Sequence, residues 1–305
     1  HRTITGDAGP HLLITAGVHG DEYEPMAAVR ALAQRFDART LRGRVTLVPI
    51  VNQSAFARAA RCGDDGLDLA RVCPGDVDGS VTMKAAAALT RMIGEADYYI
   101  DLHTGGTIYN IMPLCGYGLA TASRDVLDAQ RRMARAFDLP IVWGCDGRAD
   151  GRSLSAARDA GVPAIYTEFG GGVDFSPHVV YAYVEGCLNV AAELGMIDRD
   201  RPASAVKYVV EDDRDDSGYL QIKHPATCDG FFEHAVRVGD VVRVGQPLGH
   251  VLAGPFGERR VAVPAGDTGL VLFLKRVVSV KQGEGLGGIL PIVEPGEVRF
   301  DREGN

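Results

Sequence analysis

The chain has 305 residues, of which 46% are hydrophobic, and a formal net charge of −8 at pH 7. This length suits one large domain or two of ordinary size, and the composition is that of a globular protein with a full core. An acidic chain is poorly matched to a phosphate backbone, so we expect no nucleic-acid partner. Because no apolar run approaches the length of a bilayer span, we expect no membrane partner either.

Six cysteines lie at irregular spacings, and none of them forms a Cys-x-x-Cys pair. In a chain of this length the pattern is typical of reduced thiols rather than of a disulfide framework, so we expect a cytoplasmic protein. The sequence opens at His1 with neither an initiator Met nor a leader pattern, so we expect its true start to be missing.

Residues 1–202 alternate short β-rich runs with amphipathic helical patterns. Alternation of this kind predicts an α/β sheet covered by helices on both faces. The predicted strands are residues 12–16, 45–51, 98–102, 140–143 and 163–167, and the predicted helices are residues 24–36, 82–93, 123–137 and 179–194.

The pattern changes near residue 200, where a polar stretch and a charge run are followed by short β runs with glycine turns at residues 241–251, 260–263 and 270–274. We therefore predict an α/β domain over residues 1–202 and a smaller all-β domain over residues 203–305. Residues 245–251 and 283–289 both read G-[QE]-x-L-G-x-[VI], which indicates either a barrel-sandwich of two similar halves or two hairpins alike by chance.

His19 and Glu22 follow the first predicted strand, where the chain turns into a helix. Ligand sites in open α/β sheets lie at such carboxyl ends, and residues three apart at a helix start share a face. His103 ends another predicted strand, and two histidines with one carboxylate form a zinc-ligand set that leaves a position for water. We therefore predict one Zn²⁺ per chain, held by His19, Glu22 and His103. Asp101 lies on the same sheet face as His103 and is expected to orient its imidazole.

Hydrolysis at such a site needs a base, and Glu168 lies at another strand end, before three glycines. Its carboxylate could take a proton from water and pass it to a leaving amine. Arg61 and Arg71 lie in the stretch after the second predicted strand, and a guanidinium can hold a carboxylate or stabilise an oxyanion. Taken singly, a strand-end glutamate or a loop arginine is more often a solvated surface residue.

Together these segments resemble the succinylglutamate desuccinylase/aspartoacylase family, which is related to the zinc carboxypeptidases. The resemblance spans residues 14–172 and rests on five motifs in the family's order, at residues 17–22, 52–61, 68–75, 101–103 and 167–168. It implies a zinc-carboxypeptidase-like mixed sheet flanked by helices, followed by a smaller all-β, barrel-sandwich-like domain.

The resemblance also implies a role for each matched residue. Glu168 would be the general base, and Arg61 would polarise the scissile carbonyl. Arg71 would hold a substrate carboxylate. Asn52 opens this loop and Asp68 steadies it, so both are grouped with the substrate-binding residues.

Two positions depart from the family pattern. Ala70 stands where the family has an asparagine that helps to hold the carboxylate, and Cys73 replaces a phenylalanine before Pro-Gly. The loss of a carboxamide donor weakens the expected recognition of a free α-carboxylate, whereas the expected metal ligands are all present.

We predict a zinc-dependent hydrolase that cleaves the amide bond of a small N-acyl amino acid or a related N-acyl amine. One branch of the family deacetylates N-acetyl-diaminobutyrate, and the tail resembles that branch. A zinc carboxypeptidase acting on small peptides stays open, although Ala70 weakens it. A non-catalytic binding or carrier protein also stays open, although the hairpin tip at residues 263–269 lacks the lysine of biotinyl and lipoyl carriers. The sequence does not decide whether the chain forms a homo-oligomer.

Overall fold

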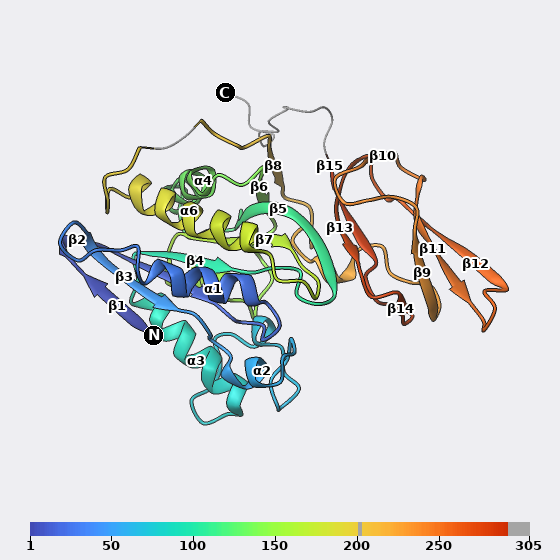
Figure 1. Ribbon diagram of the computed structural model, residues 1–305, viewed down its shortest axis with the longest axis horizontal. Helices are drawn as coiled ribbons and strands as arrows, with labels where there is room; N and C mark the ends of the chain where they lie inside the picture. The colour runs from blue at the N-terminus through green and yellow to red at the C-terminus, as the bar shows by residue number, and fades with distance from the viewer. Residues whose placement is uncertain (201–202, 292–305) are drawn as a thin grey trace.

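The computed structural model describes residues 1–200 and 203–291. A large mixed sheet with helices on both faces stands beside a smaller antiparallel β unit (Figure 1). The predicted fold class is therefore confirmed. Within the described residues, no helix combines the length and the apolar character needed to cross a bilayer.

The large sheet has the strand order β1-β3-β2-β4-β7-β5, and β6 and β8 continue it beyond β5. Neighbours among β2, β3, β4 and β7 pair in parallel, whereas β5 runs antiparallel to β7. The strands are β1 (Arg2–Thr5), β2 (Asp7–Ala16), β3 (Arg42–Val48), β4 (Tyr98–Leu102), β5 (Tyr109–Gly118), β6 (Ile141–Cys145), β7 (Ala164–Gly170) and β8 (Tyr208–Asp212).

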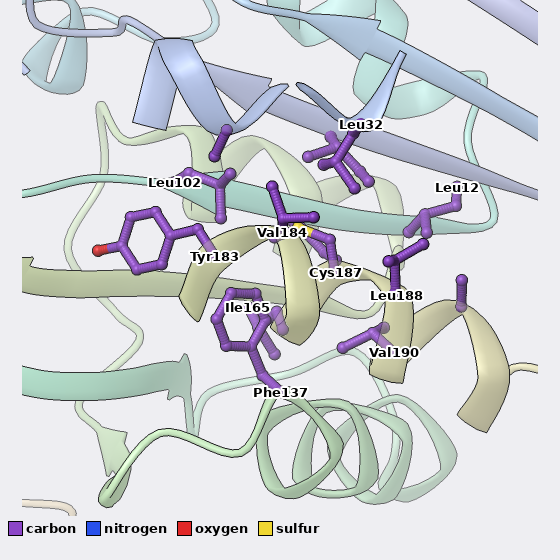
Figure 2. Packing of buried hydrophobic residues seen from close by; sticks show 14 of the residues in the cluster. Leu12, Leu32, Leu102, Phe137, Ile165, Tyr183, Val184, Cys187, Leu188 and Val190 are labelled. Atoms are coloured by element: carbon purple, nitrogen blue, oxygen red, sulfur yellow. The ribbon is translucent and has the colours of Figure 1, made fainter. Parts of the chain in front are cut away.

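Helices cover both faces of this sheet because the central strands are apolar on both faces. Leu12 and Ile14 of β2 belong to one core cluster and Leu13 to another. The first face carries α1 (Tyr23–Leu32), α4 (Arg124–Phe137) and α6 (Pro177–Glu193), and the second carries α3 (Val81–Gly94) and α5 (Ser153–Ala160). In Figure 2, side chains of α6 such as Val184 lie among those of the sheet and of the neighbouring helices.

The sequence analysis missed β5, which holds the two parts of the molecule together. Its register shifts between Ile111 and Leu114, where Pro113 interrupts the strand. Proline has no N–H to donate to a sheet, and it therefore falls at irregular points of strands and masks their pattern. One end of β5 pairs with β6, and the other pairs with β13 of the small unit.

The small β unit is built from two halves that exchange short strands. β11 pairs with β9 and β15 with β13, whereas β10 crosses to β13 and β14 crosses to β9. Gly245 and Gly283 occupy equivalent turns with φ of +82° and +90°. This exchange favours a true repeat over a chance likeness. The strands are β9 (Gly230–His234), β10 (Val241–Val242), β11 (Pro247–Ala253), β12 (Arg259–Pro264), β13 (Gly269–Lys275), β14 (Ser279–Val280) and β15 (Gly287–Pro291).

The boundary between residues 202 and 203 stays a prediction. β8, on the far side of that boundary, pairs with β6 and so belongs to the large sheet. The stretch from residue 213 to 229 then leads to the small unit, and its short 3-10 helix η2 (Leu220–Ile222) carries residues that line the pocket described below. Residues 292–305 of the predicted second domain lie outside the described residues.

Candidate active site

Three neighbouring parallel strands, β2, β4 and β7, place His19, Glu22, His103 and Glu168 at or beyond their carboxyl ends. His19 and Glu22 lie in the turn between β2 and α1, His103 follows β4, and Glu168 lies near the end of β7. Ala16 pairs with Leu102, and Leu102 in turn pairs with Thr167. The residues that follow these positions therefore start from adjacent points of the sheet.

The turn that carries His19 lies against the backbone of α2 (Gln53–Ala57). A Cβ on Gly20 would lie 2.0 Å from the carbonyl carbon of Ala55. Asn52 caps α2, because its Oδ1 accepts a hydrogen bond from the Ala55 N–H at 3.1 Å. Asn52 does not line the pocket, so its contacts in the structure are those of a residue that holds the loop.

We expect Gly20→Ala to lower the free energy of unfolding by roughly 1–3 kcal/mol, because the turn and α2 must move apart to admit a methyl group. Urea unfolding followed by circular dichroism would measure the change. Gly94→Ala is the matched control, since a Cβ at Gly94 would meet nothing within 4 Å. Equal stability of both variants would contradict the close approach.

The carboxylate of Glu22 lies between the two predicted histidine ligands. Its Oε1 is 2.7 Å from His19 Nδ1, and its Oε2 is 2.9 Å from His103 Nδ1. The three residues are buried, and their candidate ligand atoms lie within 4.8 Å of one another. Burial alone would raise the pKa of Glu22, but the two imidazoles outweigh it and hold that pKa well below its usual range. The result is a buried nitrogen and oxygen donor set of the kind that zinc prefers.

Each imidazole also meets a second carboxylate through its other nitrogen. His19 Nε2 lies 3.2 Å from Asp68 Oδ1, and His103 Nε2 lies 3.1 Å from Asp101 Oδ2. Asp101 is fully buried and accepts hydrogen bonds from the hydroxyls of Thr15 and Ser153. A carboxylate at Nε2 selects the tautomer that leaves Nδ1 free to bind a metal. The residues present therefore fit a divalent metal ion.

Asp68 connects the candidate metal site to the arginine-bearing loop. Its Oδ2 accepts a hydrogen bond from Arg61 Nε at 3.0 Å, and its Oδ1 accepts one from the Ala70 N–H at 2.9 Å, which caps the 3-10 helix η1 (Leu69–Arg71). Burial would lower the pKa of Arg61, but the charges of Asp68 and Glu22 outweigh it and raise that pKa. Asp68 does not line the pocket, so the structure shows it holding its neighbours in place.

Five of the predicted site residues line one pocket, which has a cavity volume of about 120 Å³. Its lining includes the predicted residues His19, His103, Glu168, Arg61 and Arg71. The Oε2 atom of Glu168 is buried and has no hydrogen-bond partner among the described residues. Burial and the negative charge of Glu22 raise the pKa of Glu168 well above its usual value. A cation bound beside it would oppose that rise.

The structure also brings residues to Arg71 that the sequence analysis did not identify. Arg71 Nη2 donates to Gln221 Oε1 at 3.0 Å, and the guanidinium carbon lies 5.0 Å from the ring centre of Tyr219. Arg152 lies 5.3 Å from the same ring. No motif marks these residues, and Gln221 and Arg71 are 150 positions apart in the chain.

Comparison with known proteins identifies the family. A family model described as the succinylglutamate desuccinylase/aspartoacylase catalytic domain matches residues 8–194. The chain belongs to this family. It is 32% identical over 293 residues to the N-alpha-acetyl-L-2,4-diaminobutyric acid deacetylase of Halomonas elongata, a match that covers 94% of this chain and 83% of that relative.

Two solved structures related to the family share the fold over nearly the whole chain. One is a succinylglutamate desuccinylase from Silicibacter sp. TM1040, with a TM-score of 0.86 and 27% identity over 94% of this chain and 86% of that chain. The other is the product-bound ectoine utilization protein EutE of Ruegeria pomeroyi, with a TM-score of 0.86 and 27% identity over 94% of this chain and 87% of that chain. The family predicted from the sequence motifs is therefore confirmed.

Proposed function

We propose that this protein is a zinc-dependent amidohydrolase that removes the acyl group from a small N-acyl amino acid or a related N-acyl amine. The observation that carries the proposal is the buried convergence of His19, Glu22 and His103 beside a pocket that also presents Glu168 and Arg61. The relative from Halomonas elongata supports an N-acetylated diamino acid as the first substrate to test.

His19, Glu22 and His103 would hold the ion, and zinc supplies Lewis-acid activation of water and of an acyl carbonyl when it is bound. Glu168 would take the proton of the attacking water on its buried, unpartnered Oε2 and deliver it to the leaving amine. Arg61, which Asp68 holds in place, would direct its guanidinium at the acyl oxygen as that oxygen becomes negative.

Arg71 would hold the carboxylate of the amino-acid part, because its guanidinium lines the same pocket. Asn52 and Asp68 are proposed to act through the loop, by capping α2 and η1, and Asp101 by orienting His103. We also propose a single zinc per chain and a cytoplasmic location. The first is supported by one candidate metal cluster among the described residues, and the second by six free cysteines.

Metal analysis combined with a deacylase screen would test the proposal. We expect about one zinc per chain, because three ligands define one site. We also expect release of free amine from N-acetyl-L-2,4-diaminobutyrate and from other N-acetyl amino acids, with dipeptides of similar size as the comparison. Zinc-loaded protein that cleaves dipeptides but none of the N-acyl amino acids would favour the carboxypeptidase instead.

A further inference from the structure

The catalytic pocket contains the carboxamide of Gln221, a residue that lies 150 positions after Arg71 in the sequence. Gln221 lies in η2, between β8 and β9, and lines the pocket together with Arg71 and Ala70. Its Oε1 accepts a hydrogen bond from Arg71 Nη2 at 3.0 Å. A guanidinium only donates hydrogen bonds, so this contact determines which end of the amide is the oxygen. The two N–H groups of Nε2 have no acceptor within residues 1–200 and 203–291.

Arg71 is held in place by a backbone carbonyl and an aromatic ring and not by a carboxylate. Its Nη1 donates to the carbonyl oxygen of Ala70 at 2.7 Å, and its guanidinium lies over the ring of Tyr219. Among the described residues no carboxylate forms an ion pair with Arg71, whose contacts are with Ala70, Gln221 and Tyr219. The guanidinium and the free Nε2 group of Gln221 therefore form a pair of adjacent donors in the pocket, and an anion with two oxygens can accept from both.

Ala70 explains why a donor is needed from elsewhere. It lines the pocket directly before Arg71 in the chain, but its methyl group cannot donate a hydrogen bond. We propose that Gln221 is a specificity-determining residue that donates from Nε2 to the substrate carboxylate held by Arg71. This inference rests on the proposed function, and it assigns part of the substrate site to the stretch that leads into the small β unit.

The test compares two substrates with the zinc-loaded full chain, N-acetyl-L-2,4-diaminobutyrate and its α-carboxamide, in which a neutral amide with one acceptor oxygen replaces the anion with two. Gln221→Glu keeps the length of the side chain and an acceptor for Arg71 but removes the donor, and Gln221→Ala removes both. For the carboxylate substrate we expect KM to rise about 10-fold or more in each variant, with kcat changed by less than about 3-fold, because a hydrogen bond to a charged group is lost.

The α-carboxamide should show no comparable change in KM. Gln282→Ala is the matched control, since Gln282 is exposed in the small unit and does not line the pocket. A KM that rises equally for both substrates would indicate that Gln221 has only a structural role, and it would overturn the inference. An unchanged KM for the carboxylate substrate would overturn it as well.

Restoring a carboxamide at the other position gives a second test. Ala70→Asn added to Gln221→Ala should bring KM most of the way back to the wild-type value, because residue 70 lines the same pocket. Calorimetric titration with L-2,4-diaminobutyrate and with its α-carboxamide supplies a readout that needs no turnover, and Gln221→Glu should weaken only the former. Equal weakening of both would overturn the inference. Wild-type protein that binds the carboxylate with this dependence on Gln221, yet cleaves no N-acyl substrate, would overturn the proposed function alone.

Discussion

Glu168→Gln is expected to retain the metal and lose most of its turnover. Glu168 lines the pocket beside His19 and His103 but belongs to neither the candidate metal cluster nor its hydrogen bonds. Glutamine has nearly the same shape and cannot accept a proton from water at neutral pH. We expect kcat to fall by about 10²- to 10⁴-fold, the usual contribution of a positioned general base, with zinc content unchanged. Steady-state kinetics and elemental analysis of the same preparation would measure both.

Glu233→Gln is the matched control, because Glu233 is exposed on β9 in the small unit and does not line the pocket. It should retain wild-type kcat and zinc content. Full turnover by Glu168→Gln with normal zinc content would remove Glu168 from the mechanism. Loss of zinc from that variant would instead indicate that Glu168 binds the ion, and the assignment of the three ligands would then be wrong.

The central strands and the convergence of His19, Glu22 and His103 could be predicted because local and long-range signals coincide there. Residues 98–102 are a largely apolar run that is followed directly by His103, and the structure has β4 over the same residues. The turn after β2 likewise follows an apolar run. Polar residues after buried parallel strands fall at one edge of the sheet, so strand ends alone indicate where side chains can meet. The sequence pattern alone does not indicate that β2 and β4 are neighbours. The resemblance to the family indicated that the residues after these two strands meet.

The residues around Arg71 could not be predicted in the same way. Tyr219 and Gln221 lie in a stretch without hydrophobic periodicity or a motif, and they reach Arg71 only because β8 pairs with β6 and directs the following chain past the pocket. Residue 208, where β8 begins, was assigned to the second domain because the composition changes near residue 200. The composition of a segment indicates how much of that segment is buried on average. It does not indicate with which strand the segment pairs.

Replacement of Glu22 by alanine is expected to cost the protein both its metal and its activity. Glu22 contacts both imidazoles, at 2.7 Å and 2.9 Å, so its removal deletes one proposed ligand and also the contact that holds the other two proposed ligands together. Loss of even an indirect partner typically weakens a metal site about 10- to 100-fold, and loss of a ligand should weaken it further. Zinc content after dialysis and turnover without added zinc would measure the effect.

Thermal unfolding separates loss of the ion from loss of the fold. A ligand that binds only the native state raises Tm as its concentration rises, so zinc should stabilise metal-stripped wild-type protein and have little effect on Glu22→Ala. Glu95→Ala is the control, since Glu95 is exposed at the end of α3 and should respond to zinc as the wild type does. Chelator-treated wild-type protein should match Glu22→Ala in activity, and added zinc should restore only the former. If Glu22→Ala keeps one tightly bound zinc and its turnover, the ion binds elsewhere, and the convergence of His19, Glu22 and His103 serves structure instead of catalysis.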